Sequence, residues 1–490
     1  MTQARRGRQQ DRDRADRESD GVLGDWSTPG AGWRERLLAG RALRKTVPRS
    51  AHADGGVPDD RDPIGILQAQ AAERVPDLVG IRHARMAVSP FAYLRGAAAV
   101  MAADLATTPV TGPRVQLCGD AHVRNFGTFA TPERNLTFSI NDFDETLPGP
   151  WEWDVKRFAA SLHVVATEHG FPTPVCRGLV AAAVRAYRQR MRGYAWMSAI
   201  QVFYDLKGVN DLLGHYTADA RSQVKRDIAK ARQRGHRRAI AKRTRAADDD
   251  GIAAEVQRSG GTVRFREDPP IQVHLEPAGH QMDEALATYA SYRDSLPDDK
   301  RVLLGRYQIL DVARRVVGVG SVGTLVWICL LEAHSRSRGD RLVLQCKQAQ
   351  PSVLEPYLQP SPIAHAGRRV VAGQRLTQGP TDTFLGWCTA PNSGRQYYVR
   401  QLWDRKGRSD LTTMSRSGLT EHATLCAWAL ARAHARSGDA AAISGYLGRS
   451  DVFDRAIGAF AERYSACTTR DHETLLEAIT DGRLPGGDLI

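Results

Sequence analysis

Apolar residues follow two different spacings along this chain, and the change between them limits the possible folds more than any other feature. Between Asp62 and Ala106 they recur every three or four positions, which is typical of amphipathic helices, and this pattern returns at residues 151–192 and after Leu419. After Arg301 the pattern changes to β-branched runs separated by glycine, which is typical of short strands. The chain is therefore predicted to be an α+β protein.

The predicted organisation follows the same change of pattern. The 490 residues, 42% of them apolar, suffice for one large two-lobed unit or for two to three ordinary domains. Residues 1–60 are rich in Arg, Asp, Gly and Pro, so we expect a disordered basic tail there. Residues 61–300 and 407–490 are predicted to be mainly helical, and residues 301–406 to form a β-rich unit. Two helices are expected between residues 62 and 106, the second beginning at Ser89 and Pro90.

Short strands are predicted where apolar runs end at turn residues. Residues 115–118 and 136–140 indicate two strands that flank a polar loop. Between residues 312 and 403, five β-branched runs follow one another, with one helix at 362–378 between the third and the fourth. The last two runs flank the sequence Pro-Asn-Ser-Gly, which predicts a hairpin turn.

The first cluster of chemically capable residues lies in the polar loop and after the strand that follows it. It reads Gly-Asp120-Ala-His122-Val-Arg-Asn125, and then Asn-Asp142-Phe-Asp144. Phosphoryl transfer needs a carboxylate that holds the acceptor hydroxyl, together with carboxylate and amide oxygens that hold Mg²⁺ against the phosphates. This cluster supplies that set, although a plain polar turn is the competing interpretation.

The second cluster is the glycine-rich sequence Gly318-Val-Gly320-Ser321-Val-Gly323. Such a sequence occurs in dinucleotide-binding turns as well as in kinase loops. A dinucleotide-binding turn must open a helix, so that the pyrophosphate meets the helix N-terminus. Residues 324–329 favour a strand instead, so the kinase interpretation is preferred, and a nicotinamide cofactor is the rival ligand class.

Lys347 follows the glycine-rich sequence in a predicted strand. The two-residue period of a strand puts Val343, Gln345 and Lys347 on one face. Lys347 would then point at the α and β phosphates of a nucleotide. The alternative is an edge-strand lysine whose ammonium group reaches water.

The two clusters resemble the catalytic core of aminoglycoside phosphotransferases and choline kinases. The sequences GDAHVRN, NDFDE and WEWDVKRFA are similar to the catalytic loop, the acidic magnesium motif and the structural Asp of those enzymes, and ALARAHARSG at 429–438 is similar to the helix after their hinge. In those families the glycine loop and the lysine precede the catalytic loop, whereas here they follow it. The resemblance implies a protein-kinase-like two-lobed fold in permuted order, with the helical lobe and catalytic loop first and a small antiparallel β lobe second.

Over nearly the whole chain after residue 60, the sequence also resembles a bacterial family named domain of unknown function 2252. The segments RMAVSPFAYLRGAAAVMAADLA and YYVRQLWDRKG carry this resemblance, together with the stretch from VQLCGDAHVRN to WEWDVKR. The family brings no established substrate.

Carried over residue by residue, the kinase resemblance implies a role for each motif position. Asp120 would orient the acceptor, Asn125 and Asp142 would bind magnesium, and Lys347 would bind phosphate. Asp144 would assist the metal, and His122 would hold the catalytic loop by hydrogen bonding or act as a ligand. The residues expected to cover the nucleotide are Gly318, Gly320, Ser321 and Gly323.

One departure from the kinase pattern concerns the partner of Lys347. The predicted helix at 362–378 has no acidic residue, so Gln374, or Glu355 from the preceding loop, is expected to substitute. Arg85 and Arg95 are expected either to clamp an anionic acceptor or to form ordinary salt bridges.

Charge and cysteine usage suggest the partners and the compartment. The net charge of +13 suits an anionic partner, and eleven Lys or Arg residues lie in the segment 221–245. That segment has no aromatic residue, so a solvated helix face is preferred to a nucleic-acid site. No apolar stretch reaches the length of a membrane span, the N-terminus has no signal-peptide pattern, and the seven cysteines are scattered singly. A cytoplasmic protein without a membrane partner is expected.

The predicted function is therefore phosphotransfer that depends on ATP and Mg²⁺, with an unidentified acceptor. One alternative is a kinase-like module that binds nucleotide for regulation with little turnover. Another is a metal-dependent phosphohydrolase, which needs Asp120, His122, Asp142 and Asp144 to converge on one metal.

Overall fold

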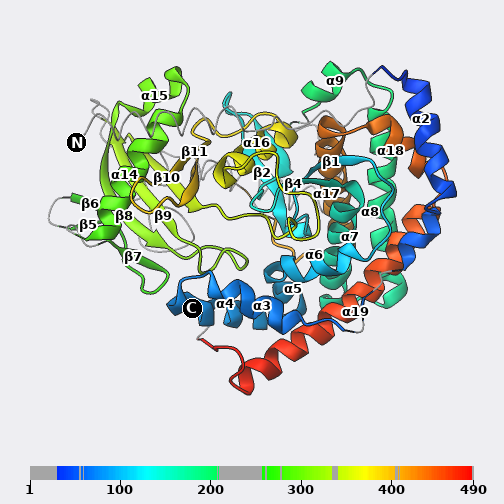
Figure 1. Ribbon diagram of the computed structural model, residues 1–490, viewed down its shortest axis with the longest axis horizontal. Coiled ribbons are helices and arrows are strands. Elements are labelled where there is room, and N and C mark those ends of the chain that lie inside the picture. The colour runs from blue at the N-terminus through cyan, green and yellow to red at the C-terminus, as the bar shows by residue number, and fades with distance from the viewer. Residues whose placement is uncertain are drawn as a thin grey trace.

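We describe the protein from a computed structural model. It describes residues 30–487, apart from residues 55–56, 59, 207, 209–255, 260–261, 276–278, 334–339, 403–406 and 408. The basic segment 221–245 lies outside the described residues. Within the described part, no helix combines the length and the apolar character needed to cross a bilayer. The fold is α+β, with an antiparallel sheet on one side and a group of helices on the other (Figure 1).

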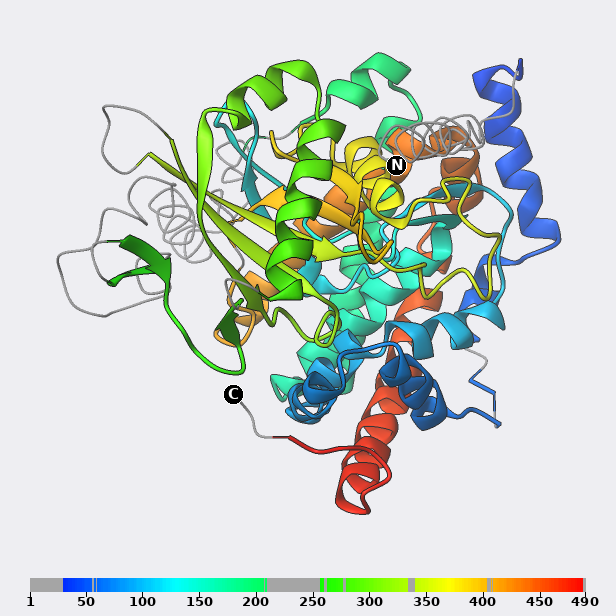
Figure 2. The ribbon, with the colours of Figure 1, turned by 60° about the vertical axis from the view of Figure 1, so that its left-hand side comes forward.

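The largest sheet has six strands in the order β11-β12-β10-β9-β8-β7, and every neighbouring pair is antiparallel. Its strands are β7 (Gln272–His274), β8 (Tyr307–Arg315), β9 (Val326–Ala333), β10 (Arg341–Gln348), β11 (Gly386–Thr389) and β12 (Gln396–Gln401). The five strands and the hairpin predicted after residue 301 are present, and β7 adds a sixth strand. A small ribbon of β5 (Val256–Ser259) and β6 (Thr262–Phe265) lies beside β8. Helix α14 (His280–Ser295) crosses one face of the sheet, and α15 (Asp298–Leu304) follows it (Figure 2).

Alternation along β10 decides which side chains face α14. Leu342, Leu344 and Cys346 belong to the apolar core that includes Tyr292 of α14. Val343, which has the opposite parity, packs in a separate cluster on the other face. Lys347 shares the parity of Val343, so it projects away from α14, as the two-residue period predicts.

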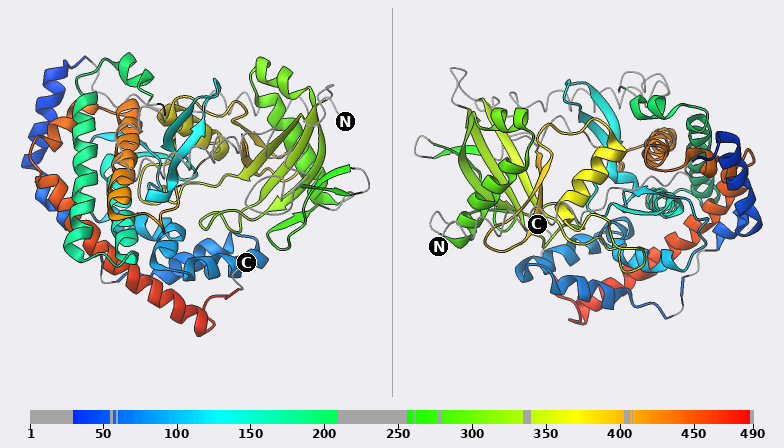
Figure 3. Two further views of the ribbon diagram at one scale, coloured as in Figure 1. Left: turned by 180° about the vertical axis from the view of Figure 1, so that it is seen from behind. Right: turned by 45° about the horizontal axis from the view of Figure 1, so that its top comes forward.

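The helical part combines segments from both halves of the chain (Figure 3). Its main helices are α7 (Trp151–Glu168), α8 (Thr173–Tyr194), α17 (Arg416–Ser437), α18 (Ala440–Leu447) and α19 (Val452–Thr480), with the short α9 (Ala199–Tyr204) after α8. Helices α17 and α19 pack directly against α7 and α8. Every residue of α7 from Trp151 to Ala166 is buried, as expected for a helix at the centre of a domain.

The segment between residues 62 and 106 forms four helices, so the expectation of two is wrong. They are α3 (Pro63–Ala72), α4 (Pro76–Ala87), α5 (Pro90–Gly96) and α6 (Ala98–Ala106). Proline cannot continue a helix because it lacks the backbone N–H, and Pro76 and Pro90 each begin a new one. The hydroxyl of Ser89 caps α5 by accepting from the N–H of Ala92 at 3.2 Å, which agrees with the predicted start. The α3–α6 segment lies between the sheet and the long helices (Figure 1).

Two short antiparallel ribbons carry the loops of the first motif cluster. Strand β1 (Arg114–Leu117) pairs with β4 (Leu147–Pro150), and β2 (Phe126–Ala130) pairs with β3 (Leu136–Ile140). The strands predicted at 115–118 and 136–140 are therefore present. Residues 118–125 and residues 141–146 both connect one ribbon to the other, so these two loops lie side by side.

The expectation of a disordered tail up to residue 60 is wrong for the region from Trp33 to Ala53. This region forms α2 (Trp33–Ala42) and two short 3₁₀ turns, η1 (Leu43–Lys45) and η2 (Arg49–Ala53). Helix α2 packs against α18, and the Arg44 Nε and Arg49 Nη1 atoms each donate to α18 carbonyls at 2.8 Å. Contacts with residues about 400 positions away supply this order, and local composition cannot reveal them.

Candidate functional site

A cleft opens where the sheet, the α3–α6 segment and the two connecting loops meet. It encloses about 1220 Å³, including the space at its open mouth. The predicted site residues that line it are Asp120, His122, Asn125, Asp142, Asp144, Gly318, Gly320, Ser321 and Lys347. Arg95 also lines the cleft, whereas Gly323, Arg85, Glu355 and Gln374 do not. The structure thus brings together two motif clusters that are far apart in the sequence.

The loop that carries Asp120 is held by the buried carboxylate of Asp154, in the first turn of α7. Asp154 accepts hydrogen bonds from the backbone N–H groups of Cys118 (2.8 Å) and Gly119 (3.0 Å). The Nε2 atom of His434, on α17, lies 3.3 Å from the same carboxylate. Gly119 has a φ of +81°, and a Cβ at this position would lie 2.1 Å from the Glu145 carbonyl oxygen. Glycine is therefore required immediately before Asp120.

Asp120 is anchored on one oxygen by Arg157 of α7. The Oδ1 atom of Asp120 accepts from Arg157 Nε at 2.9 Å and from Nη2 at 2.8 Å. Burial raises the pKa of Asp120, and the charge of Arg157 opposes that rise. Because Asp120 lines the cleft while Arg157 holds Oδ1, its carboxylate is fixed in orientation and can meet a ligand.

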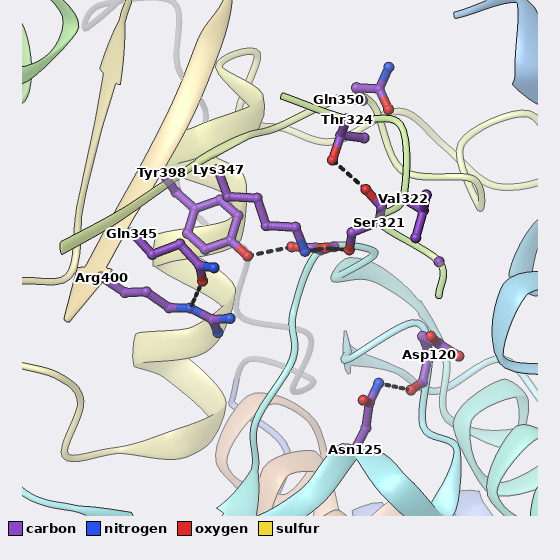
Figure 4. A network of polar contacts seen from close by, with 12 residues as sticks. Asp120, Asn125, Ser321, Val322, Thr324, Gln345, Lys347, Gln350, Tyr398 and Arg400 are labelled. Atoms are coloured by element: carbon purple, nitrogen blue, oxygen red, sulfur yellow. Dashed lines mark hydrogen bonds and ion pairs between the residues drawn. The ribbon is translucent and has the colours of Figure 1, made fainter. Parts of the chain in front are cut away.

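Asn125 and His122 lie on either side of the Asp120 loop. Asn125 donates from Nδ2 to the Asp120 carbonyl at 2.7 Å (Figure 4), so the amide oxygen is the atom left for a metal. The Asn125 carbonyl accepts from the N–H of Asn141 at 2.8 Å, which ties the two loops together. The His122 Nε2 atom lies 3.7 Å from Asp120 Oδ2, and its ring meets the edge of Phe91.

Lys347 and Asp144 form an ion pair across the cleft, although 203 positions separate them in the chain. The Asp144 carboxylate also accepts from the Tyr398 hydroxyl at 2.6 Å and from the Ser321 hydroxyl at 3.3 Å. In Figure 4, Lys347 and Tyr398 extend from the sheet toward Ser321, and Asp120 lies farther into the helical part. Residues from three segments therefore meet on one carboxylate.

The environment of Lys347 keeps it charged. Burial opposes its charge, but Asp144, Tyr398 and Asp142 together outweigh that effect and raise the pKa of Lys347 above its usual value. Its side chain is only 3% exposed, and β10 lies between β9 and β12. The alternative of an edge-strand lysine reaching water is therefore wrong.

Neither expected substitute is the partner of Lys347. Gln374 donates from Nε2 to Gln378 at 2.9 Å, and Glu355 accepts from the Ser352 N–H at 3.3 Å. The partner is Asp144, which comes from the connecting loop of residues 141–146, called here the acidic loop, and not from α16 or the loop before it. The expectation of a partner close in sequence to Lys347 is wrong because tertiary packing supplies that partner from a distant segment.

Helix α16 (Ala366–Gln378), which has no acidic residue, contributes the cation Arg369 next to the acidic loop. The guanidinium of Arg369 donates to the carbonyls of Thr146 at 2.6 Å, and of Asp144 and Gln350 at 2.8 Å each. Arg369 is buried, and these bonds hold the backbone of the acidic loop in place. They fix the position from which the Asp144 side chain reaches Lys347.

The glycine-rich loop between β8 and β9 is attached to the α3–α6 segment through its carbonyl groups. Arg85 donates to the Gly318 carbonyl at 2.7 Å, and Arg74 donates to the carbonyls of Gly320 (2.9 Å) and Val322. Gly318 has a φ of +69°, which favours glycine at this turn. Arg85, expected as an anion clamp, thus contacts the loop itself.

Sequence reasoning missed four residues of this site: Arg74, Arg157, Arg369 and Tyr398. Arg157 lies one helical turn after Asp154, a spacing that places both on the same side of α7 and could have indicated it. The other three act through contacts between distant segments, and no local pattern marks them.

The oxygen atoms in the cleft suit magnesium better than a closed metal cage. Asp142, Asp144 and Asn125 offer carboxylate and amide oxygens, and all three line the cleft. Among the described residues, no three His, Cys, Asp or Glu side chains are arranged to hold a metal by themselves. Magnesium bound with a nucleotide keeps water and phosphate oxygens and needs only one or two carboxylates. The donor set fits that case, whereas the four-ligand centre required for the phosphohydrolase alternative is not found in the described part of the chain.

Comparison with known proteins gives a family and no activity. A model of the family described as uncharacterized proteins conserved in bacteria, DUF2252, matches residues 74–478. The matched range includes the Asp120 loop, the acidic loop, the glycine-rich loop and Lys347. No curated protein and no solved structure matches the chain. The chain belongs to the DUF2252 family of proteins conserved in bacteria.

Proposed function

We propose that this protein is a phosphotransferase that uses ATP and Mg²⁺, with a protein-kinase-like architecture in permuted order. The observation that carries the proposal is the ion pair between Lys347 and Asp144. This ion pair joins β10, a strand that follows the glycine-rich loop in the chain, to the acidic loop. The two meet in a cleft that Asp120 also lines. Phosphoryl transfer requires these elements on one site.

The order of the elements supports the kinase-like comparison. Along the chain, β8 leads into the glycine-rich loop, β9 follows, β10 carries Lys347, and α16 precedes the β11–β12 hairpin. This is the arrangement that the resemblance to kinases implies for a nucleotide-binding lobe. The C-terminal helices α17 and α19 return to pack on α7 and α8. A helical lobe assembled from both chain halves is what a circular permutation would produce.

Each residue has a distinct part in the proposed reaction. Asp120, fixed by Arg157, would orient the acceptor hydroxyl and accept its proton. Asn125 and Asp142 would hold Mg²⁺, which would neutralise the phosphate charge while ATP supplies the phosphoryl group. Lys347 would bind the phosphates, and Asp144 would orient Lys347 and remain close enough to assist the metal.

A second candidate is a module that binds nucleotide for regulation with little turnover. The absence of an acidic residue from α16 favours it, because kinases normally pair their lysine with a glutamate on the corresponding helix. The two candidates differ in turnover and not in nucleotide binding.

Thermal unfolding with and without nucleotide, followed by ATP hydrolysis, tests the proposal. We expect MgATP to raise the unfolding temperature of the wild type more than NAD or Mg²⁺ alone, since a ligand of the native state stabilises it. Asp120→Asn should keep this response and lose hydrolysis by about 100-fold or more, the usual effect of removing a general base. The exposed carboxylate variant Asp481→Asn serves as the control and should behave as the wild type.

The outcomes separate the candidates. A wild type that responds to MgATP but hydrolyses no more than Asp120→Asn would support the regulatory module. A wild type that gives no response to MgATP would exclude both, and a response to NAD would favour a nicotinamide cofactor.

A further inference from the structure

Arg82, on α4, is a fully buried cation whose hydrogen-bonding capacity is mostly unused. Its two hydrogen bonds, to Gln70 Oε1 (3.0 Å) and to the Gly96 carbonyl (2.8 Å), both come from Nη2. A guanidinium has five N–H groups. Those on Nε and Nη1 have no acceptor among the described residues. Burial lowers the pKa of Arg82 to about 9, and the titratable groups that act on it are Arg74 and Tyr93, neither of them a carboxylate.

Two other buried arginines among the described residues bond through both of their terminal nitrogens, either to an acid or to carbonyl groups. Arg188 bonds to the Asp454 carboxylate through Nε and Nη2, and donates from Nη1 to a carbonyl. Arg369 donates to three carbonyl groups. Proteins generally compensate buried charges in this way, because an unpaired charge in a low-dielectric interior is costly. The environment of Arg82 therefore calls for an anion that the described chain does not itself provide.

Arg74 adds a second guanidinium at the same wall of the cleft. It uses Nη1 for the glycine-rich loop, while its Nε is buried and has no acceptor among the described residues. Arg74 and Arg82 repel each other, which lowers the pKa of Arg82 further. Both arginines line the cleft, as do the Gln70 and Gly96 residues that bond to Arg82. An anion with several acceptor oxygens would satisfy the unused N–H groups of both side chains.

The neighbours of this pair indicate which ligand it serves, although Arg74 also donates to carbonyls of the glycine-rich loop that is expected to cover the nucleotide. Lys347, on the sheet wall, already has its own carboxylate partner. Arg82 and Arg74 belong to the opposite wall, and Arg95, which also lines the cleft, acts electrostatically on Asp120. Because Arg95 of the same segment acts on Asp120, which is proposed to face the acceptor hydroxyl, we assign an anion held by this segment to the acceptor.

We propose that Arg82 and Arg74 form an anion subsite for the acceptor. The acceptor would carry a phosphate or carboxylate group, held by the two guanidinium groups, and would present its hydroxyl to Asp120. The assignment to the acceptor rests on the proposed phosphotransferase function, whereas the anion subsite stands on the contacts of Arg82 and Arg74 alone.

The test uses the full-length chain with inorganic phosphate and, separately, acetate as probes. Binding is measured by calorimetry and by thermal unfolding, against sodium chloride at equal ionic strength, with and without saturating MgATP. We expect at least one of the two anions to bind the wild type, and its dissociation constant to rise by about tenfold or more in Arg82→Gln, as expected for the loss of a charge-assisted hydrogen bond. Arg82→Lys should lie between the two, because lysine keeps the charge and loses the planar fork.

Two further variants keep the test decisive. Arg74→Gln should weaken the same binding and serves if Arg82→Gln does not fold. Arg455→Gln removes an exposed arginine paired with Asp451 on α19 and should bind as the wild type. The subsite is refuted if neither anion binds the wild type. It is also refuted if Arg82→Gln and Arg74→Gln both bind the anion as tightly as the wild type does.

The MgATP arm identifies the source of the anion. Binding that persists in saturating MgATP supports the acceptor, whereas competition would assign the anion to the terminal phosphate of the donor and overturn the acceptor assignment. If MgATP by itself does not raise the unfolding temperature of the wild type, but anion binding still depends on Arg82, the subsite stands and the proposed phosphotransferase function fails.

Discussion

The two walls of the cleft treat buried positive charge in opposite ways. On the sheet wall, Lys347 has a carboxylate partner in Asp144, which also accepts from Tyr398 and Ser321. On the α3–α6 wall, Arg82 is equally buried and has no anion among the described residues. A charge compensated inside the protein contributes to folding, whereas an uncompensated one destabilises the ligand-free protein and becomes favourable when an anion binds. The sign of a stability change should therefore distinguish the walls.

The largest effect is expected from Lys347→Met. This variant leaves the Asp144 carboxylate without its cation, and we expect the free energy of unfolding to fall by about 2 kcal/mol. The value is below that of a fully buried pair because about a quarter of the Asp144 side chain is exposed (26%). Urea unfolding measures it. The double variant with Asp144→Asn should recover most of the loss, and an equal or larger loss in the double variant would contradict an ion pair.

Tyr398→Phe should have the next largest effect. It removes the hydroxyl that donates to Asp144 at 2.6 Å and leaves the ring in place. We expect a loss of about 1.5 kcal/mol in the free energy of unfolding, the lower limit for a hydrogen bond to a charged group. A variant as stable as the wild type in urea would show that this bond is not formed in solution.

Arg82→Met should change stability in the opposite direction. It removes a buried charge without an anion, so we expect the free energy of unfolding to rise by about 1 kcal/mol in phosphate-free buffer. The matched change at a compensated site, Arg188→Met, should instead destabilise the protein because it leaves the buried Asp454 with only the more distant Arg185, at 4.0 Å. A clear loss of stability in Arg82→Met would mean that an internal partner compensates this arginine and that the two walls do not differ.

The smallest effect is expected from Ser321→Ala. The Ser321 hydroxyl lies 3.3 Å from Asp144, which is long for a hydrogen bond between oxygens. We expect a loss of about 0.5 kcal/mol, measured by urea unfolding beside Tyr398→Phe. A loss larger than that of Tyr398→Phe would show that the glycine-rich loop, and not the sheet, dominates the compensation of this wall.

Much of the fold could be predicted from local pattern. The strands β8 to β12, the hairpin after β11, and the face on which Lys347 lies follow from β-branched runs and the two-residue period. The capped start of α5 at Ser89 follows from its sequence as well. The local pattern did not reveal that one helix ends and another begins at Pro76. It also did not reveal that α2 is ordered, because that order depends on contacts with residues distant in sequence.

The candidate site, like the fold, could be predicted from the sequence only in part. Asp120, Asn125, Asp142 and Lys347 were identifiable because their residue types and spacing match a chemical requirement. The partner of Lys347 and the unsatisfied N–H groups of Arg82 could not be identified in this way. Each is a relation between segments that are distant in sequence, so its signal does not exist before the chain has folded.

The sequence by itself determined which residue types were available and on which face of each local element they would lie, because strand and helix periods are properties of neighbouring residues. Only the tertiary structure decided which buried charges found partners. Compensation depends on distances of a few ångströms between segments, and the same arginine or lysine is stabilising or costly according to what folding places beside it. Lys347 and Arg82 illustrate the two outcomes.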